Sequence, residues 1–229
     1  RGTLGDSLPL RVRMRETIDA ASTLDLDTKP GRVVSIAPCA VIGDIHGRAD
    51  LLEKLLARLP RDASVLVVGD LCDRGPDTRR VLDLLIERGA RGALGNHEEW
   101  LIRWARGDGF LHEARAIGAT ATLASYGVTA KDAHDVSARS DAVPREHLAF
   151  LESLGHAVDL QVQGTAFWIV HAGIATTQAL GRAGTLDRVV PYLVEHHPDV
   201  LLWGHTDPAA TLPVDRPVIM GHICRSAPK

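Results

Sequence analysis

Short hydrophobic runs alternate with amphipathic stretches along most of this chain. From Arg32 onward the pattern repeats three times as an apolar run, a turn and a stretch with helical spacing. The predicted strand and helix pairs are 39–43 with 48–59, 64–69 with 77–88, and 90–95 with 98–106. Such alternation indicates βαβ units and a largely parallel sheet. We therefore expect an α/β protein.

The rest of the chain departs from this repeat. Residues 108–154 are helical and irregular, which predicts a small cap inserted over the site, with one helix starting at Pro144. A hairpin at 157–163 and 165–170 and a helix at 186–196 follow, and then two apolar runs, 200–203 and 217–220, each ending in Gly-His. We expect residues 1–31 to form an N-terminal extension with a short helix near 13–20, and residues 32–229 to form one domain that contains the cap.

Composition narrows the class of protein. With 229 residues, 45% hydrophobic and 24% charged, the chain can bury one sizeable core. A net charge of -3 gives no field that favours nucleic acid or a membrane surface, and no apolar run approaches a membrane span or a signal peptide. Three cysteines at unrelated spacings argue against disulfides. These features predict a cytoplasmic protein without a membrane partner, and they disfavour nucleic acid.

Polar clusters lie at the ends of five apolar runs. They are Asp44-Ile45-His46, Asp70-Leu71-Cys72-Asp73-Arg74, Asn96-His97-Glu98, His171-Ala172-Gly173 and Gly221-His222. Ligands of open α/β sheets bind beyond the carboxyl ends of the strands, where these clusters fall. Carboxylates, imidazoles and an amide suit divalent manganese, iron or zinc. Any one cluster alone is more often a turn, but the set together predicts a metal site.

Individual residue types suggest roles within that site. Asp44 and His46 are two apart, so an extended backbone directs both to one side. Asp70 is placed to bridge two ions, and the Asn96 amide can ligate without adding charge. His97 is free for proton transfer. Glu98 and Cys72 are expected to be structural, the first facing a helix N-terminus and the second filling the core.

The order GDxHG, GDxxDRG, GNHE, HAG and GH resembles the calcineurin-like metallophosphoesterases, and the resemblance covers Val41 through His222. It is most similar to the phosphoprotein phosphatase branch with its bacterial and phage members. The segment 119–127 also looks like the cap of bacterial members, although Ala119 stands where a second glycine is common. The resemblance implies a four-layer αββα sandwich with a dinuclear metal site at the carboxyl ends of the strands.

The resemblance also implies two ligand sets. One metal would be held by Asp44, His46 and Asp70, and the other by Asp70, Asn96, His171 and a final histidine. Two divalent ions, Mn²⁺ first with Fe or Zn as alternatives, would share a hydroxide that attacks phosphorus.

The same resemblance implies three further roles. His97, oriented by Asp73, would protonate the leaving oxygen, and Arg74 would grip the phosphate oxygens. Asn96 and His205 complete the expected substrate contacts.

Two histidines compete for the final ligand position. His205 has the better local match to the family's GHT, whereas His222 ends a cleaner strand. Many bacterial members place Leu-Leu-Trp-x-Arg before the last motif, and residues 201–205 fit that stretch with His205 in place of the arginine. We therefore prefer His222 as the ligand. The phosphate grip of the missing arginine would then pass to His205 or Arg216.

These motifs predict a serine/threonine protein phosphatase-type enzyme acting on a phosphorylated protein or a small phosphoester. Dinucleoside polyphosphate hydrolysis and removal of terminal phosphates from RNA use similar motifs and stay open. Nucleotides favour an aromatic platform, and only 4% of the residues are aromatic, which counts against both. A binding module that has lost turnover is the non-enzyme alternative, but the intact Asp73, Arg74 and His97 argue against it.

Overall fold

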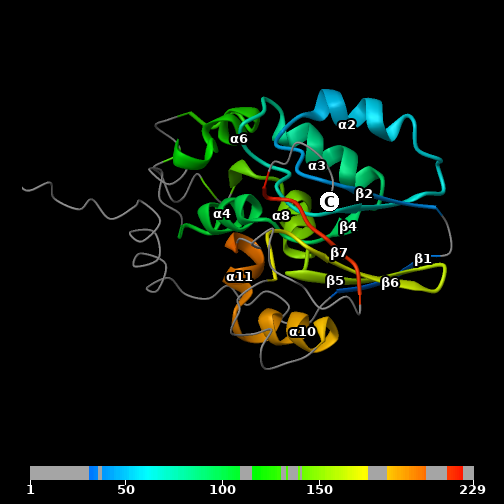
Figure 1. The fold of residues 1–229 in the computed structure, drawn as a ribbon. Helices are drawn as coiled ribbons and strands as arrows, with labels where there is room; N and C mark the ends of the chain where they lie inside the picture. Colours follow the sequence, from blue (N-terminus) through cyan, green and yellow to red (C-terminus); the bar gives the residue numbers. More distant parts are fainter. Residues whose placement is uncertain are drawn as a thin grey trace, which may run out of the picture.

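The computed structural model describes residues 31–35, 38–108, 115–129, 133, 139, 141–174, 185–204 and 216–223. These residues form two sheets flanked by helices (Figure 1). The three-stranded sheet, in the order β2-β3-β4, is parallel and consists of β2 (Cys39–Ile42), β3 (Ser64–Val67) and β4 (Arg91–Gly92). Its βαβ pattern confirms the α/β prediction.

The four-stranded sheet has the order β1-β5-β6-β7. Its strands are β1 (Gly31–Ser35), β5 (Ala157–Val162), β6 (Thr165–Val170) and β7 (Val218–Ile219). β5 and β6 form the predicted antiparallel hairpin, while β1 and β7 join its two sides in parallel. The hairpin turn consists of Gln163 and Gly164, both with positive φ (48° and 85°), as a two-residue type I′ turn requires.

Helices come after each strand of the parallel sheet. They are α2 (Ala49–Leu56), α3 (Thr78–Glu87) and α4 (Asn96–Ala105). The later helices are α6 (Thr120–Ser125), α8 (Arg145–Glu152), α10 (Leu186–His196) and α11 (Pro198–Trp203). α6 and α8 lie within the predicted cap, and both pack against α3. None of the helices in the described ranges is both long and apolar enough to span a membrane.

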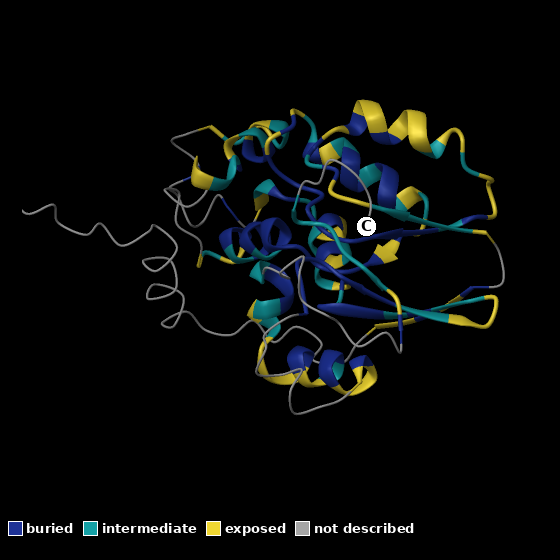
Figure 2. Ribbon diagram, in the orientation of Figure 1, coloured by how far each residue is buried: buried dark blue, intermediate teal, exposed yellow. Residues whose placement is uncertain are grey.

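Alternating side chains divide the core into layers. Along β3, Val65 and Val67 pack with the helices of the parallel sheet, while Leu66 packs against the second sheet. On β6, Ile169 faces this space between the sheets, and Trp168 packs with α10 on the other side. Helices, sheet, sheet and helices therefore stack as four layers, with the sheets largely buried and the outer face of α2 exposed (Figure 2).

Some elements differ from the expected pattern. The apolar run 200–203 is helical in α11, because Pro198 at the first helical position has a fixed φ suited to a helix start, while 217–220 supplies only the short β7. β1 was not among the predicted strands, and it pairs in parallel with β5. The predicted short helix at 13–20 lies outside the described residues, so the extension remains a prediction.

Candidate metal centre

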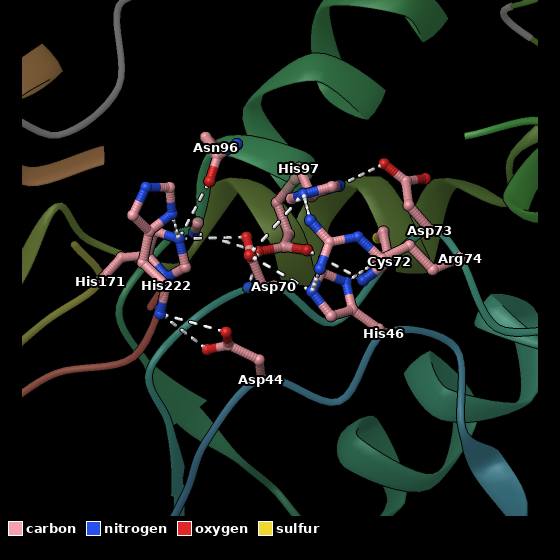
Figure 3. Close-up of polar contacts among 12 residues, drawn as sticks. Asp44, His46, Asp70, Cys72, Asp73, Arg74, Asn96, His97, His171 and His222 are labelled. Carbon is pink, nitrogen blue, oxygen red and sulfur yellow. Dashed lines mark hydrogen bonds and ion pairs between the residues drawn. The ribbon is translucent and has the colours of Figure 1, made fainter. Parts of the chain in front are cut away.

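All five polar clusters meet at one end of the two sheets (Figure 3). Asp44 follows β2, Asp70 follows β3, Asn96 follows β4, His171 follows β6 and His222 follows β7. Several of these loops adopt left-handed backbone that non-glycine residues rarely use. The positions are His46 (φ 46°), Asp70 (53°), Asp73 (71°), Arg74 (66°) and His222 (66°). Such conformations cost about 1–3 kcal/mol each and cluster at functional sites.

The imidazole of His171 shows why a cation is needed here. Its Nδ1 donates to the carbonyl oxygen of Val68 at 2.9 Å, so Nε2 carries the lone pair of the neutral ring. That Nε2 lies 3.0 Å from Oδ1 of Asn96 and 3.1 Å from Oδ1 of Asp70. Oδ1 of Asp70 is buried and accepts no hydrogen bond from the residues described. A lone pair and two acceptor oxygens this close together require a cation or a proton between them.

His46 is oriented in the same way. Its Nδ1 donates to the carbonyl oxygen of Cys72 at 2.8 Å, and its Nε2 lies 3.6 Å from Oδ2 of Asp70. Metal-binding histidines commonly donate their other ring nitrogen to a backbone carbonyl. Asp70 therefore lies between two donor groups, and the ligand atoms of each lie within 4.8 Å of one another. The groups are His46, Asp70 and His97, and Asp70, His171 and His222.

His222 and Asp44 complete the surroundings of Asp70. Nδ1 of His222 lies 3.2 Å from Nε2 of His171, so the cluster after β7 reaches the centre. The Asp44 carboxylate accepts the backbone N–H of His222, with both oxygens 3.1 Å from that nitrogen. Asp44 is outside the two donor groups, but it lines a pocket of about 430 Å³. The other lining residues are His46, Arg74, Gly221, His222 and Ile223.

The charges of the centre shift its titrating groups. Burial raises the pKa of Asp70, but the neighbouring histidines, led by His171, outweigh it and hold that pKa below its usual value. Burial lowers the pKa of His171, but the hydrogen bond to Asp70 and the charge of that carboxylate raise it by more, so the net shift of the pKa is upward. For His46 burial prevails, and the pKa falls. The carboxylate at the centre stays ionised and attracts positive charge.

His97 and Asp73 form a buried pair beside this centre. Nδ1 of His97 lies 2.6 Å from Oδ2 of Asp73, which directs Nε2 toward Asp70, 3.7 Å from its Oδ2. Burial lowers the pKa of His97, but the hydrogen bond to Asp73 and the charge of Asp70 raise it above its ordinary value. The guanidinium of Arg74 contacts both His46 and His97, with nitrogens 2.8 Å from Nε2 of His46 and 3.4 Å from Nε2 of His97.

The family model for calcineurin-like phosphoesterases matches residues 37–208. The chain belongs to this family. The fold and the ordered motifs agree with that assignment, so the predicted resemblance to the family is confirmed.

Individual relatives of this chain carry different names. A "Bis(5'-nucleosyl)-tetraphosphatase, symmetrical" of Ralstonia nicotianae is 34% identical over 68% of this chain and 50% of its own length. "Serine/threonine-protein phosphatase 2" of Escherichia coli is 32% identical over 58% of this chain and 56% of its own. "Serine/threonine-protein phosphatase 1" of Salmonella typhimurium is 44% identical over 27% and 30%. The chain thus spans about half the length of the first two relatives, or less for the third.

Glu98 has a larger structural role than the sequence indicated. It lies in the first turn of α4 and accepts the backbone N–H of Gly95, the N-cap residue, at 3.0 Å, as expected of an acid at that position. Its buried carboxylate also accepts three backbone N–H groups from the loop after β3. The donors and distances are Asp70 at 2.7 Å, Leu71 at 2.8 Å and Cys72 at 3.1 Å. The position of Glu98 in the first helical turn predicts its bond to the N-terminus of α4, but it gives no signal for the contacts with the loop after β3.

The phosphate contacts predicted to replace an arginine have different outcomes. His205 lies outside the described residues, so its role remains a prediction. Arg216 does not reach the pocket. It donates to Asp187 at 2.7 Å and to the carbonyl oxygen of Phe167 at 2.9 Å, pairs with Asp159, and stacks over Trp168 at 4.2 Å. The expectation that Arg216 grips phosphate is therefore wrong, because its donors are used inside the second sheet.

Proposed function

We propose that the chain hydrolyses phosphate monoesters with two divalent ions. Asp44, His46 and Asp70 would hold one ion, and Asp70, Asn96, His171 and His222 the other. The observation that carries this proposal is the set of ligand atoms around Asp70, which lie so close together that a cation or a proton must lie between them. When bound, such ions lower the pKa of a water and polarise phosphate oxygens. The choice of Mn²⁺ and a cytoplasmic location remain predictions.

The residues of the chain supply the remaining chemistry. Nε2 of His97 would hold the proton that the leaving oxygen receives as its bond to phosphorus breaks. The raised pKa of His97 supports this role, since it keeps the ring protonated closer to neutral pH. Arg74 lines the pocket, and its planar guanidinium suits two phosphate oxygens at once.

The leading substrate is a phosphorylated serine or threonine in a protein, or a small phosphoester. The described lining of the pocket includes no indole or phenyl ring on which a base could stack. Trp100 and Trp104 are buried in the core, and the Tyr126 hydroxyl is bonded to His147 at 2.8 Å. Phe150 in the cap packs against the core, and Phe110 lies outside the described residues.

Dinucleoside polyphosphates are the second candidate. The Ralstonia nicotianae relative supports them, since it matches a longer stretch of this chain than the two protein phosphatases. The same centre could cleave a phosphoanhydride, because metal ions held by these ligands would polarise the phosphate oxygens of an anhydride as they would those of a monoester.

Side-by-side assays with added Mn²⁺ test the proposal. The substrates are a phosphoserine peptide, diadenosine tetraphosphate and a 3′-phosphorylated oligonucleotide, with His97→Ala as the matched variant. Faster turnover of the peptide supports the leading candidate, and faster turnover of the tetraphosphate supports the second. Negligible and equal rates for the native chain and His97→Ala on all substrates would instead mean an inert scaffold.

A further inference from the structure

Thr122, in the cap, contacts Asp73, the residue that orients the proton donor His97. It lies on α6, is fully buried, and is 49 residues from Asp73 in the chain. Its Oγ1 accepts the backbone N–H of Asp73 at 2.8 Å and donates to Oδ1 of the same residue at 2.7 Å. One hydroxyl therefore fixes both the backbone and the side chain of Asp73.

Thr78 extends this arrangement into α3. Its Oγ1 lies 2.8 Å from that of Thr122. A threonine hydroxyl has a single hydrogen, and that of Thr122 is directed to Asp73, so Thr78 is the donor between the two. The hydrogen bonds run from Thr78 to Thr122 to Oδ1 of Asp73, while Oδ2 accepts from Nδ1 of His97 at 2.6 Å. Both carboxylate oxygens are thus occupied, which fixes the ring of His97.

The same cap segment restrains the backbone of this loop. The N–H of Arg74 donates to the carbonyl oxygen of Gly118 at 3.1 Å. Asp73 and Arg74 are consecutive and both left-handed, with φ of 71° and 66°. Non-glycine residues keep such a conformation only when their surroundings hold them in it. Residues 118–122 provide that restraint from a distant part of the chain.

We propose that Thr122 is a positioning residue for proton transfer to the leaving group. It lies outside both groups of metal-ligand candidates and outside the pocket lining, and it acts on His97 through Asp73. The proton moves from Nε2 of His97 to the leaving oxygen as the P–O bond breaks, and Thr122 neither gains nor loses one. This inference rests on the proposed function, specifically on His97 as the proton donor.

Leaving groups of different basicity separate this role from a general loss of structure. Nitrophenolate leaves without a proton, whereas the serine alkoxide requires one. Thr122→Val removes the hydroxyl at nearly constant volume. We expect it to lower kcat on a phosphoserine peptide by roughly tenfold or more, out of the 10²–10⁴ that a general acid contributes, and kcat on p-nitrophenyl phosphate by less than about threefold. Thr122→Ser keeps the hydroxyl, so it should restore the peptide rate with unchanged Mn²⁺ content.

A double variant shows whether Thr122 acts through His97. In a His97→Ala background, Thr122→Val should cause no further loss on the peptide, because the group it positions is gone. Equal losses on both substrates, or additive losses in the double variant, would overturn the inference. If Thr122→Val does not fold, Thr78→Val carries the test with the same expected selectivity. No turnover by the native chain, or no leaving-group dependence in His97→Ala, would overturn the proposed function and this inference together.

Discussion

Oε2 of Glu98 accepts the backbone N–H of Asp70 at 2.7 Å, which ties the first turn of α4 to the carboxylate at the centre. Replacing Glu98 with Gln puts an amide N–H₂ among backbone donors and leaves at least one of them unsatisfied. We expect Glu98→Gln to lower the free energy of unfolding by about 1–3 kcal/mol and to weaken metal binding. Thermal unfolding and Mn²⁺ titration measure the two effects.

Glu53→Gln is the matched control for Glu98. Glu53 is exposed on α2 and pairs with Arg80 on the surface, so the same acid-to-amide change should alter stability by less than about 0.5 kcal/mol. If the two variants unfold alike, the buried contacts of Glu98 do not stabilise the site.

Asp70→Asn tests whether one carboxylate serves both donor groups. The change keeps the shape of the side chain but removes the charge that lies 3.1 Å from His171 and 3.6 Å from His46. We expect a loss of both bound ions and a fall in kcat of at least about tenfold, since even changes to groups that only orient a metal ligand cost roughly 10- to 100-fold. Elemental analysis and turnover measure this, and two ions per chain with full activity would exclude the two-metal arrangement.

The two competing histidines give opposite expectations. Nδ1 of His222 lies 3.2 Å from Nε2 of His171, so His222→Ala should remove a ligand and reduce metal content and kcat together. His205→Ala should leave metal content unchanged and raise KM, if His205 contacts only the substrate. A larger loss of metal from the His205 variant would reassign the ligand.

Substitution of Arg74 should affect substrate binding, whereas substitution of Arg216 should affect stability. Arg74 is exposed in the pocket, so Arg74→Lys should raise KM by several-fold while changing the unfolding temperature little, because lysine cannot grip two oxygens. Arg216→Lys should lower the free energy of unfolding by about 1–3 kcal/mol, since it loses the fork to Asp187 and Phe167. Its KM should stay near the native value, and a rise like that of Arg74→Lys would place Arg216 at the substrate.

The strand ends were the part of the site that the sequence predicted best. Periodicity placed the βαβ units, and a carboxylate or amide soon after an apolar run placed Asp44, Asp70 and Asn96 at one sheet edge. These signals are local, because strand, turn and ligand are adjacent in the chain.

Contacts between distant segments were beyond such reasoning. Gly95 approaches Asp70 so closely that a Cβ there would lie 2.4 Å from the Asp70 nitrogen, and this approach brings Glu98 within reach of that loop. Thr122 looked like one of several residues of an Ala-rich cap. Spacing cannot show that its hydroxyl meets Asp73, 49 residues earlier, because that depends on how α6 packs against α3.

The histidines of the centre should make stability depend on pH in opposite directions with and without metal. The pKa values of His97 and His171 are raised above 6.5, so their protonated forms stabilise the metal-free fold below that pH, and this stability is lost as pH rises through the folded-state values. The pKa of His46 is lowered in the folded state, so this histidine changes the free energy of unfolding only below about pH 6.5. In EDTA the free energy of unfolding should therefore fall as the pH rises above about 6.5.

Added Mn²⁺ should reverse that trend. Metal binds the neutral imidazole nitrogens, so it competes with protons and binds more tightly as pH rises. Denaturant titrations across the same pH range, in EDTA and in excess Mn²⁺, measure both slopes. Asp73→Asn should flatten the EDTA slope, because the hydrogen bond to Asp73 raises the pKa of His97. Equal slopes with and without Mn²⁺ would show that these histidines do not hold the metal, since a ligand that must lose its proton couples binding to pH.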